Sequence, residues 1–419
     1  MKILGNINLE GDKSISHRAL ILASMCKGES IITNLPSSKD ILSTIACLRE
    51  TGISILVENN QAIVKGGTFS IPSKKLNCNN SGTSMRLLAG LYSSIQLPVT
   101  LCGDSSLSQR PMKRIIEPLS QMGVTIVSNK GKAPIELVRF NLQPLNYRVL
   151  LASAQVKSCL ILASINMPEK SVIKQNIKTR DHLELMIDSV SKDLIEVDNN
   201  KITINGINSS SLKNFDINIP GDISSASYLI GLAVMLDGSK LVINNLLLNP
   251  LRTGFIDTLI LMGADIKLDN IKNIRNERVG RLTVIGGARL RPCFIEKDKI
   301  SSMIDEIPLL SLICAHIEGE SVIDGLQELQ YKESDRLIGT LSILTAMGVD
   351  VKKEKEFSLI INGKNKLYNT NNLNNAKDHR LAMIIVCAQI ISKGQVIFDN
   401  CINISFPKFK ELVDRILID

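Results

Sequence analysis

The sequence lacks several features that mark common classes of protein. It contains no tryptophan, and only 3% of its 419 residues are aromatic, so platforms on which nucleic-acid bases could stack are scarce. Its longest apolar runs, such as residues 381–391, are shorter than the ~18 to 20 residues that a membrane-crossing helix needs. No apolar signal segment follows Met1. We therefore expect a cytoplasmic protein that binds neither nucleic acid nor a membrane.

The 9 cysteines and 4 histidines form no metal-binding pattern. No two cysteines are spaced as a C-x-x-C pair, and most lie in apolar runs, where a free thiol behaves as a small hydrophobic side chain. A zinc site or a disulfide framework is therefore not expected. The phosphate-binding motifs G-x-x-x-x-G-K-[ST] and G-x-G-x-x-G are also missing, so no nucleotide cofactor is indicated.

The net charge is +8, from 49 lysines and arginines against 41 acidic residues. Taken alone, this excess could indicate a polyanionic partner. However, long basic blocks are missing, and most of the lysines read as a solvated surface. The positions of particular basic residues are more informative than their number.

The chain repeats one pattern six times, with a period of roughly 70 to 80 residues. Each segment has a polar start, an apolar helix, a short turn and a strand. The helices are expected to begin near residues 12, 81, 153, 221, 305 and 378, and the strands at 31–34, 99–101, 172–174, 241–244, 322–324 and 396–399. A second, amphipathic helix in several units ends before a glycine that suits a left-handed position, at Gly52, Gly123, Gly263 and Gly348.

Alternating strands and helices predict an α/β or α+β fold. Each repeat reads as a small βαβαββ unit, and six units favour two domains of three units each. The midpoint of the chain falls near residues 220–222, where the fourth repeat begins.

Basic residues recur at the starts of the repeat helices. A helix N-terminus attracts phosphate and carboxylate groups, whereas cations there oppose the helix dipole unless an anion binds. For any single start, capping or a solvated helix end is the better explanation of such residues. The recurrence along the whole chain favours anionic substrates. The stretches concerned are residues 11–18, 80–86, 110–111, 332–336 and 378–380.

These stretches, together with Ser-Ala-Gln at 153–155 and Ser-Phe-Pro at 405–407, occur in the order typical of one enzyme family. As an ordered set, they resemble the 5-enolpyruvylshikimate-3-phosphate synthases (3-phosphoshikimate 1-carboxyvinyltransferases). The resemblance spans nearly the full length of the chain. It includes the Gly-Asp-Lys-Ser-Ile-Ser-His-Arg run at 11–18 and the Lys-Glu-Ser-Asp-Arg run at 332–336.

The resemblance implies an inside-out α/β architecture with one domain at 12–220 and the other at 1–11 plus 221–419. The active site is then expected in the cleft between the domains. The implied reaction transfers the enolpyruvyl group of phosphoenolpyruvate to the 5-hydroxyl of shikimate 3-phosphate through a tetrahedral intermediate and releases phosphate. No metal or organic cofactor is implied, and a monomer is expected.

The resemblance also implies roles for individual residues. Catalysis is expected from Asp305 as base at the 5-hydroxyl, and from Glu333 and Lys13 as proton carriers at the methylene carbon. Shikimate 3-phosphate is expected to contact Lys13, Ser14, Arg18, Ser153, Gln155, Arg180, Asp305 and Lys332. Phosphoenolpyruvate is expected to contact Lys13, Asn80, Gly82, Thr83, Arg110, Gln155, Arg336 and Arg380.

Two positions depart from part of the family. Ala154 stands where some members carry a second serine, and Ile404 stands where some carry a lysine that contacts phosphoenolpyruvate. Gly82 is the small residue that the family associates with inhibition by glyphosate, so we expect glyphosate to inhibit this protein.

Two alternatives remain at this point. The sibling enzyme that uses UDP-N-acetylglucosamine carries a reactive cysteine five residues before its Arg-Pro pair, where this chain has Ser105. A non-catalytic anion-binding paralogue would not need Asp305 and Glu333 among its cations, and its affinity for polyanions would fall steeply with salt.

Overall fold

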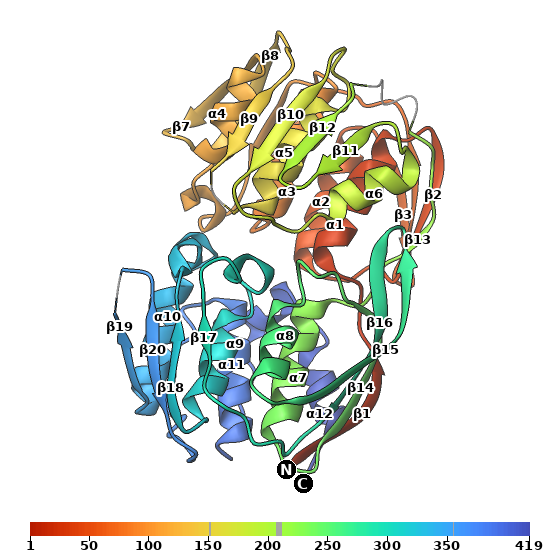
Figure 1. Ribbon diagram of the computed structural model, residues 1–419. Coiled ribbons are helices and arrows are strands. Elements are labelled where there is room, and N and C mark those ends of the chain that lie inside the picture. The colour runs from red at the N-terminus through yellow and green to blue at the C-terminus, as the bar shows by residue number, and fades with distance from the viewer. Residues whose placement is uncertain (151, 207–211, 355) are drawn as a thin grey trace. The chain divides into compact units, whose positions relative to one another are not determined.

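The computed structural model describes residues 1–150, 152–206, 212–354 and 356–419 (Figure 1). The chain forms two compact units, each of mixed α/β structure. Unit 1 contains residues 1–9, 220–272 and 278–419, and unit 2 contains residues 10–219 and 273–277. The α/β class expected from the repeats is confirmed.

Unit 2 contains three four-stranded sheets with one shared topology. In each, the first two strands are parallel, and the other two form an antiparallel hairpin beside them. The first sheet has the order β13 (Ile217–Asn218), β2 (Gly28–Thr33), β4 (Gln61–Gly66), β3 (Ser54–Glu58). The second is β5 (Leu76–Asn77), β6 (Val99–Cys102), β8 (Lys132–Phe140), β7 (Val124–Asn129), and the third is β9 (Asn146–Val149), β10 (Ser171–Gln175), β12 (Lys201–Ile204), β11 (Ile195–Asp198).

Unit 1 contains two sheets that follow the same plan. One has the order β15 (Asp265–Ile274), β16 (Glu277–Ile285), β14 (Lys240–Leu247), β1 (Lys2–Asn8), β21 (Leu417–Ile418). The other is β17 (Phe294–Ile295), β18 (Gly319–Ile323), β20 (Leu359–Gly363), β19 (Asp350–Lys353).

The strand expected at residues 396–399 does not form, so that prediction was wrong. Residues 394–399 have no regular structure. The backbone N–H of Ile397, which a neighbouring strand would need, donates instead to Oε1 of Gln389 at 2.9 Å. Asp399 then caps the short 3-10 helix η5 (Asn400–Ile404), because its side chain accepts from the backbone of Cys401. These two side-chain contacts replace the hydrogen bonds of a strand.

In one sheet of each unit, the strand that pairs in parallel comes from a distant part of the sequence. In unit 2, β13 pairs with β2, so that Ile217 lies opposite Ile32. In unit 1, β1 pairs with β14, so that Leu4 lies opposite Lys240. Each of these two strands, β1 and β13, ends just before the chain passes from one unit to the other, after residue 9 and after residue 219. Residues 273–277, the turn between β15 and β16, group with unit 2, which the repeat pattern did not predict.

Six apolar helices form the cores of the units, three in each, and all six expected helix starts are confirmed. They are α1 (Lys13–Met25), α3 (Gly82–Ser94) and α5 (Ala154–Ser164) in unit 2, and α7 (Ile223–Met235), α9 (Ile307–Ala315) and α11 (His379–Ile391) in unit 1. Most of their residues are buried on every face. Figure 1 shows the strands of each unit outside these helices, as an inside-out architecture requires.

The remaining helices lie nearer the surface. They are α2 (Lys39–Glu50), α4 (Lys113–Gln121), α6 (His182–Val190), α8 (Gly254–Leu261), α10 (Arg336–Met347) and α12 (Phe409–Ile416), with 3-10 turns η1 (Leu107–Gln109), η3 (Ile300–Ser302) and η4 (Leu326–Tyr331). The four glycines predicted to follow helices all have positive φ, from 83° at Gly348 to 106° at Gly263. That prediction is confirmed.

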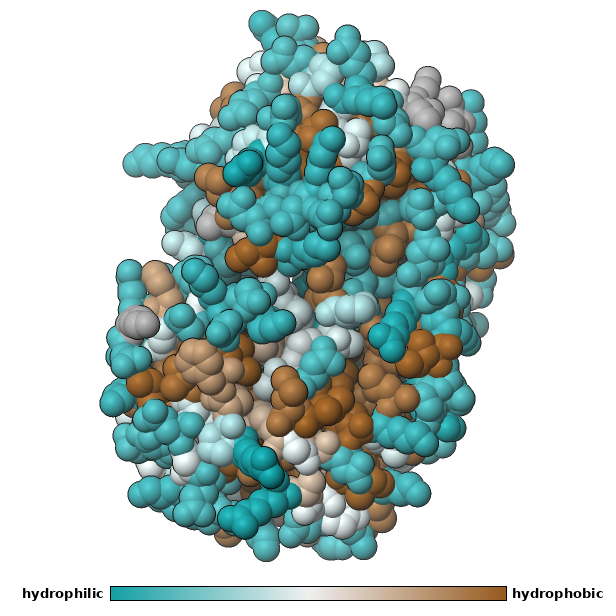
Figure 2. Space-filling model, viewed as in Figure 1, coloured by the Kyte–Doolittle hydropathy of each residue, from teal (hydrophilic) through white to brown (hydrophobic). Residues whose placement is uncertain are grey.

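The view in Figure 2 is mostly hydrophilic, and its hydrophobic residues gather mainly over unit 1. Within the described ranges, no helix is both long and apolar enough to cross a membrane.

A buried chain of hydrogen bonds ties the starts of the helices of unit 2 together. Nδ1 of His17 lies 2.7 Å from Oγ1 of Thr44, which lies 2.7 Å from Oγ of Ser84. Ser84 in turn lies 2.7 Å from Oγ of Ser81, the N-cap of α3. Burial lowers the pKa of His17 to about 3, although the charge of Asp40 opposes this shift. His17 is therefore a neutral link between α1, α2 and α3.

This burial predicts a specific dependence of stability on pH. The ordinary pKa of histidine is 6.5, so below that pH the unfolded chain binds a proton that folded His17 does not bind. The free energy of unfolding should therefore fall by about 1.4 kcal/mol for each pH unit below 6.5, until the pH nears 3. The variant His17→Asn cannot titrate and should lose about 2 kcal/mol less than the wild type between pH 7 and pH 5. Urea unfolding at the two pH values measures this difference, and an equal loss in both proteins would contradict the prediction.

Candidate active site

The N-termini of the three core helices of unit 2 meet. Nε2 of Gln155, in the first turn of α5, donates to Oγ1 of Thr83 in α3 at 2.8 Å. The hydrogen-bond chain that begins at His17 joins α1 to α3. Ser153 caps α5, because its hydroxyl accepts from the backbone of Val156 at 3.4 Å. Three positive helix ends therefore lie close together, which favours the binding of anions.

The start of α1 brings several of the predicted residues into contact. Nη1 of Arg18 donates to the carbonyl oxygen of Ser14 at 2.8 Å, and Nη2 donates to Oγ of Ser158 at 2.8 Å. Nη1 of Arg180 lies 3.4 Å from Oγ of Ser14. The side chain of Arg18 is buried. Two guanidinium groups are thus fixed beside Ser14, as a phosphate site requires.

Lys13 follows Asp12, the capping residue of α1, and its side chain contacts Asp40 of α2. Its Nζ forms an ion pair with Oδ2 of Asp40 at 2.8 Å, and both side chains are about one-sixth exposed. The pair keeps a partly accessible ammonium group at the start of the helix.

Two arginines approach the backbone of Gly82 at the start of α3. A Cβ atom on Gly82 would lie 2.9 Å from Nη1 of Arg86 and 3.2 Å from Nη1 of Arg110. Nη2 of Arg110 donates to Oδ1 of Asn80 at 2.7 Å, and Nη1 of Arg86 donates to Oε1 of Gln155. A side chain at this position would move these guanidinium groups away from the backbone. Sequence reasoning included Arg86 in the stretch 80–86 but assigned it no role, although its position one turn after Gly82 could have indicated one.

A buried ion pair supports the segment that leads to Arg180. Nζ of Lys157 lies 2.7 Å from Oε1 of Glu184 and donates to the carbonyl oxygen of Thr179 at 2.9 Å. Both charged side chains are almost fully buried. Sequence reasoning also missed this pair, because its members lie in two helices and no local motif joins them.

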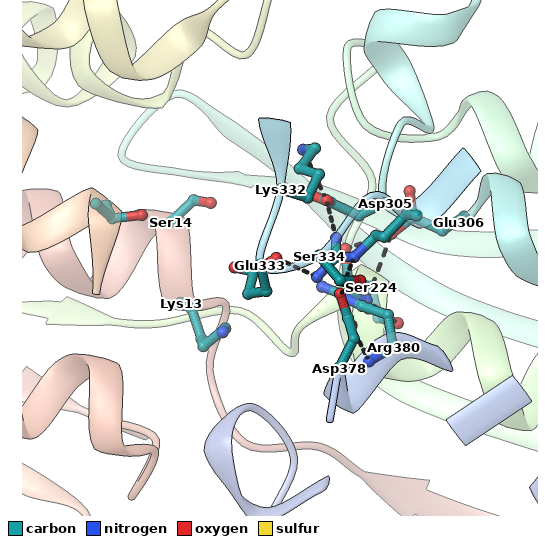
Figure 3. Close-up of polar contacts among 12 residues, drawn as sticks. Lys13, Ser14, Ser224, Asp305, Glu306, Lys332, Glu333, Ser334, Asp378 and Arg380 are labelled. Atoms are coloured by element: carbon teal, nitrogen blue, oxygen red, sulfur yellow. Dashed lines mark hydrogen bonds and ion pairs between the residues drawn. The ribbon is translucent and has the colours of Figure 1, made fainter. Parts of the chain in front are cut away.

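The polar centre of unit 1 is the guanidinium group of Arg336, which contacts three carboxylates. Figure 3 labels the residues that carry them, Asp305, Glu333 and Asp378. Its Nε lies 2.9 Å from Oδ2 of Asp378, and its Nη1 lies 3.1 Å from Oδ1 of Asp305. Nη2 pairs with Oε2 of Glu333. Nζ of Lys332 adds a second cation at 3.0 Å from Oδ1 of Asp305. The structure thus brings three of the predicted residues of this unit, Asp305, Lys332 and Glu333, together around the buried cation of the fourth, Arg336.

Neighbouring charges keep Arg336 and Asp378 ionised despite their burial. Burial alone would lower the pKa of Arg336, but the carboxylates of Asp378, Glu333 and Asp305 outweigh it and raise the pKa. Burial would likewise raise the pKa of Asp378, but the charges of Arg336 and His379 hold it below its ordinary value. An exchange of protons within the Arg336–Asp378 pair is therefore not expected at neutral pH.

The core helices of unit 1 also meet at their N-termini. Oγ of Ser224, in α7, donates to Oε1 of Glu306 at the start of α9. Nη1 of Arg380, in α11, donates to the carbonyl oxygen of Ser224 at 3.4 Å. Nη2 of Arg252 donates to Oγ of Ser224 at 2.6 Å. The sequence predicted Arg380 but not its neighbours Ser224, Arg252 and Glu306, which come from separate parts of the repeats.

The described residues contain no group of three or more His, Cys, Asp or Glu side chains that could hold a metal ion. Ile404 lies in η5, and no lysine occupies that position. What the arrangement offers is hydrogen bonding, positive charge and two carboxylates, Asp305 and Glu333, that share a cation. These groups can bind anions and move protons.

Such a set of charged helix starts on repeated βαβαββ units is that of an enolpyruvyl transferase. The structure is similar to the enolpyruvyl transferase NikO from Streptomyces tendae, with a TM-score of 0.76 over 99% of this chain and 95% of that chain. At 17% identity, this likeness shows the fold alone. The EPSP synthase from Acinetobacter baumannii is more similar, with a TM-score of 0.86 and 32% identity over 99% of this chain and 96% of that one.

Sequence comparison defines the family. The family model of EPSP synthase (3-phosphoshikimate 1-carboxyvinyltransferase) matches residues 1–413. The 3-phosphoshikimate 1-carboxyvinyltransferase of Caldicellulosiruptor bescii is 40% identical over 420 residues, which cover 98% of this chain and 96% of the relative. The chain therefore belongs to the EPSP synthase family, and its activity is that of a 3-phosphoshikimate 1-carboxyvinyltransferase of the shikimate pathway.

The Arg336 cluster predicts an unequal cost for the loss of two capping aspartates. Asp378 caps α11 and is also the buried partner of Arg336, so Asp378→Ala should lower the free energy of unfolding by about 3 to 5 kcal/mol. Asp335 caps α10 but is half-buried and makes no ion pair with Arg336, so Asp335→Ala should cost only about 1 kcal/mol. Urea unfolding of both variants measures the difference. Equal losses would mean that Asp378 acts only as a cap.

Proposed function

We propose that the helix starts of the two units act together on one pair of substrates, phosphoenolpyruvate and shikimate 3-phosphate. One observation carries the proposal: Asp305 and Glu333, the two expected proton carriers, both contact the buried guanidinium of Arg336. A base and an acid fixed to one cation suit a reaction that removes a proton at one atom and adds one at another.

In this proposal, shikimate 3-phosphate is held mainly by the start of α1. The phosphate group lies at Ser14, Arg18 and Arg180, and the contacts among these three side chains support this role. The remaining contacts come from Lys13, Ser153, Gln155, Asp305 and Lys332.

Phosphoenolpyruvate binds to the cation beside Gly82, Arg110, and to two cations of unit 1, Arg336 and Arg380. Arg110 and the backbone start of α3 provide donors that converge on one place, and Arg336 and Arg380 provide bidentate donors for a carboxylate or phosphate. The further contacts proposed are Lys13, Asn80, Thr83 and Gln155.

Asp305 accepts the proton of the 5-hydroxyl as its oxygen attacks C2 of phosphoenolpyruvate. Glu333 and Lys13 deliver a proton to the methylene carbon, which completes the tetrahedral intermediate. A proton then returns from the new methyl group to Glu333 or Lys13, the C2–O bond to phosphate breaks, phosphate departs with the proton held by Asp305, and the enol ether forms. Cations fixed around the reacting groups stabilise the charge that develops during both steps.

The binding of phosphoenolpyruvate would also release Glu333. Three of the five N–H groups of Arg336 already point to carboxylates, so a bound anion would compete with these three carboxylates for the guanidinium group. Glu333 is the most exposed of the three, with 26% of its side chain accessible against 13% for Asp305 and 0% for Asp378. We infer that the substrate displaces Glu333, which is then available for proton transfer.

The variant Glu333→Gln tests this chemistry. The amide keeps the size of the side chain but cannot carry a proton, so kcat should fall by roughly 10²- to 10⁴-fold. Release of phosphate from phosphoenolpyruvate in the presence of shikimate 3-phosphate measures the rate. Glu320→Gln, an exposed change in β18, is the matched control and should keep the rate of the wild type. A Glu333→Gln enzyme as fast as this control would exclude Glu333 as a proton carrier.

The variant Gly82→Ala tests the site at the start of α3. The new methyl group would displace Arg86 and Arg110, so the KM for phosphoenolpyruvate should rise by roughly tenfold or more. We further propose that glyphosate inhibits the wild type by binding to the same arginines beside Gly82. The variant should therefore be less sensitive to glyphosate. Steady-state rates with and without glyphosate measure both effects. A wild type that glyphosate does not inhibit would contradict the second.

We also propose that the enzyme acts as a monomer in the cytoplasm, as the resemblance implies. Light scattering after size-exclusion chromatography tests the monomer, and a mass near twice 46.0 kDa would contradict it.

A further inference from the structure

We propose that Glu306 is a positioning residue that fixes the guanidinium group of Arg380 through Ser224 and together with Arg252. The inference rests on the proposed role of Arg380 in binding phosphoenolpyruvate. It assigns a function to the second of two adjacent carboxylates, of which only Asp305 has a proposed role in the reaction.

Ser224, Glu306 and Arg380 form one network at the starts of α7, α9 and α11 (Figure 3), and Arg252, which precedes α8, joins it through Ser224. Oε1 of Glu306 accepts the hydroxyl proton of Ser224, and Oγ of Ser224 accepts from Nη2 of Arg252 at 2.6 Å. Nη1 of Arg380 lies 3.4 Å from the carbonyl oxygen of Ser224 and 4.0 Å from Oε1 of Glu306. Ser224 therefore connects the carboxylate to both arginines.

The network is buried, which makes its charges strongly dependent on one another. Glu306 is 3% exposed, Arg252 2% and Arg380 7%. Two buried guanidinium groups beside one serine would repel each other without a negative charge between them. Glu306 supplies that charge. Burial would lower the pKa of Arg380, but Tyr228, Asp305 and Glu306 outweigh it and raise the pKa.

Adjacent residues thus direct their carboxylates to different cations. Asp305 contacts Lys332 and Arg336, whereas Glu306 contacts Ser224 and faces Arg380. On its other side, the guanidinium of Arg380 lies 5.9 Å from the centre of the buried ring of Tyr228. The aromatic ring and the Glu306 network together define one position for Arg380, which a ligand would find already formed.

The test begins with Glu306→Gln, which keeps a hydrogen-bonding side chain of the same size but removes the charge. Repulsion between Arg252 and Arg380 should then move Arg380, and the KM for phosphoenolpyruvate should rise by roughly 10- to 100-fold. The KM for shikimate 3-phosphate should stay within about twofold, because its main proposed contacts lie at the start of α1. Glu318→Gln, an exposed change just after α9, is the matched control and should alter neither value.

A double-mutant cycle separates positioning from a general structural effect. Arg380→Gln removes the group that Glu306 is proposed to position, so the double variant Glu306→Gln/Arg380→Gln should bind phosphoenolpyruvate no more than about twofold worse than Arg380→Gln alone. Ser224→Ala is the second test, and it decides the matter if Glu306→Gln does not fold. It removes the connecting hydroxyl without changing charge, and it should raise the same KM by a smaller factor.

Each outcome has one meaning. An unchanged KM for phosphoenolpyruvate in Glu306→Gln, or in Ser224→Ala where that variant stands in, would overturn the inference. Fully additive effects in the cycle would also overturn it, because Glu306 would then act independently of Arg380. If Arg380→Gln itself binds phosphoenolpyruvate normally, the proposed role of Arg380 is wrong. That result differs from a failure of the inference about Glu306, because Arg380 itself would then have no role in binding for Glu306 to support.

Discussion

The structure depends on one constraint, the need to cover helices that are apolar on every side. The six core helices cannot face water, so sheets surround them and only their ends carry polar groups. The three helices of each unit meet at their N-termini, where backbone N–H groups are unpaired within the helix. The same packing that forms the core therefore brings the positive ends of three helix dipoles together in each unit. Such a place favours the binding of anionic substrates.

The two units use this common design differently. In unit 2, Arg86 and Arg110 converge on the backbone of Gly82, which suits the binding of an anion. In unit 1, Arg336 lies among Asp305, Glu333 and Asp378, so a cation and three carboxylates form one cluster. Repeats of one pattern thus carry different polar groups in the two units: guanidinium groups beside a backbone glycine in unit 2, and a guanidinium group among carboxylates in unit 1.

Much of the fold and part of the site could be predicted from the sequence, because both depend on local patterns. The six helix starts, and the left-handed glycines after the second helices, follow from periodicity and capping chemistry. The strand expected at 396–399 failed because side chains of Gln389 and Asp399 take over its hydrogen bonds. Arg252 and Glu306 were missed because their contacts form only when separate repeats pack together, which no spacing along the chain reveals.

The central claim is that both sets of charged helix starts serve one enolpyruvyl transfer with shikimate 3-phosphate as the acceptor. The most direct measurement is the release of phosphate from phosphoenolpyruvate by the purified protein, with either shikimate 3-phosphate or UDP-N-acetylglucosamine present. The account predicts rapid release with shikimate 3-phosphate and none above background with the sugar nucleotide. Release with the sugar nucleotide, or with neither acceptor, would contradict it.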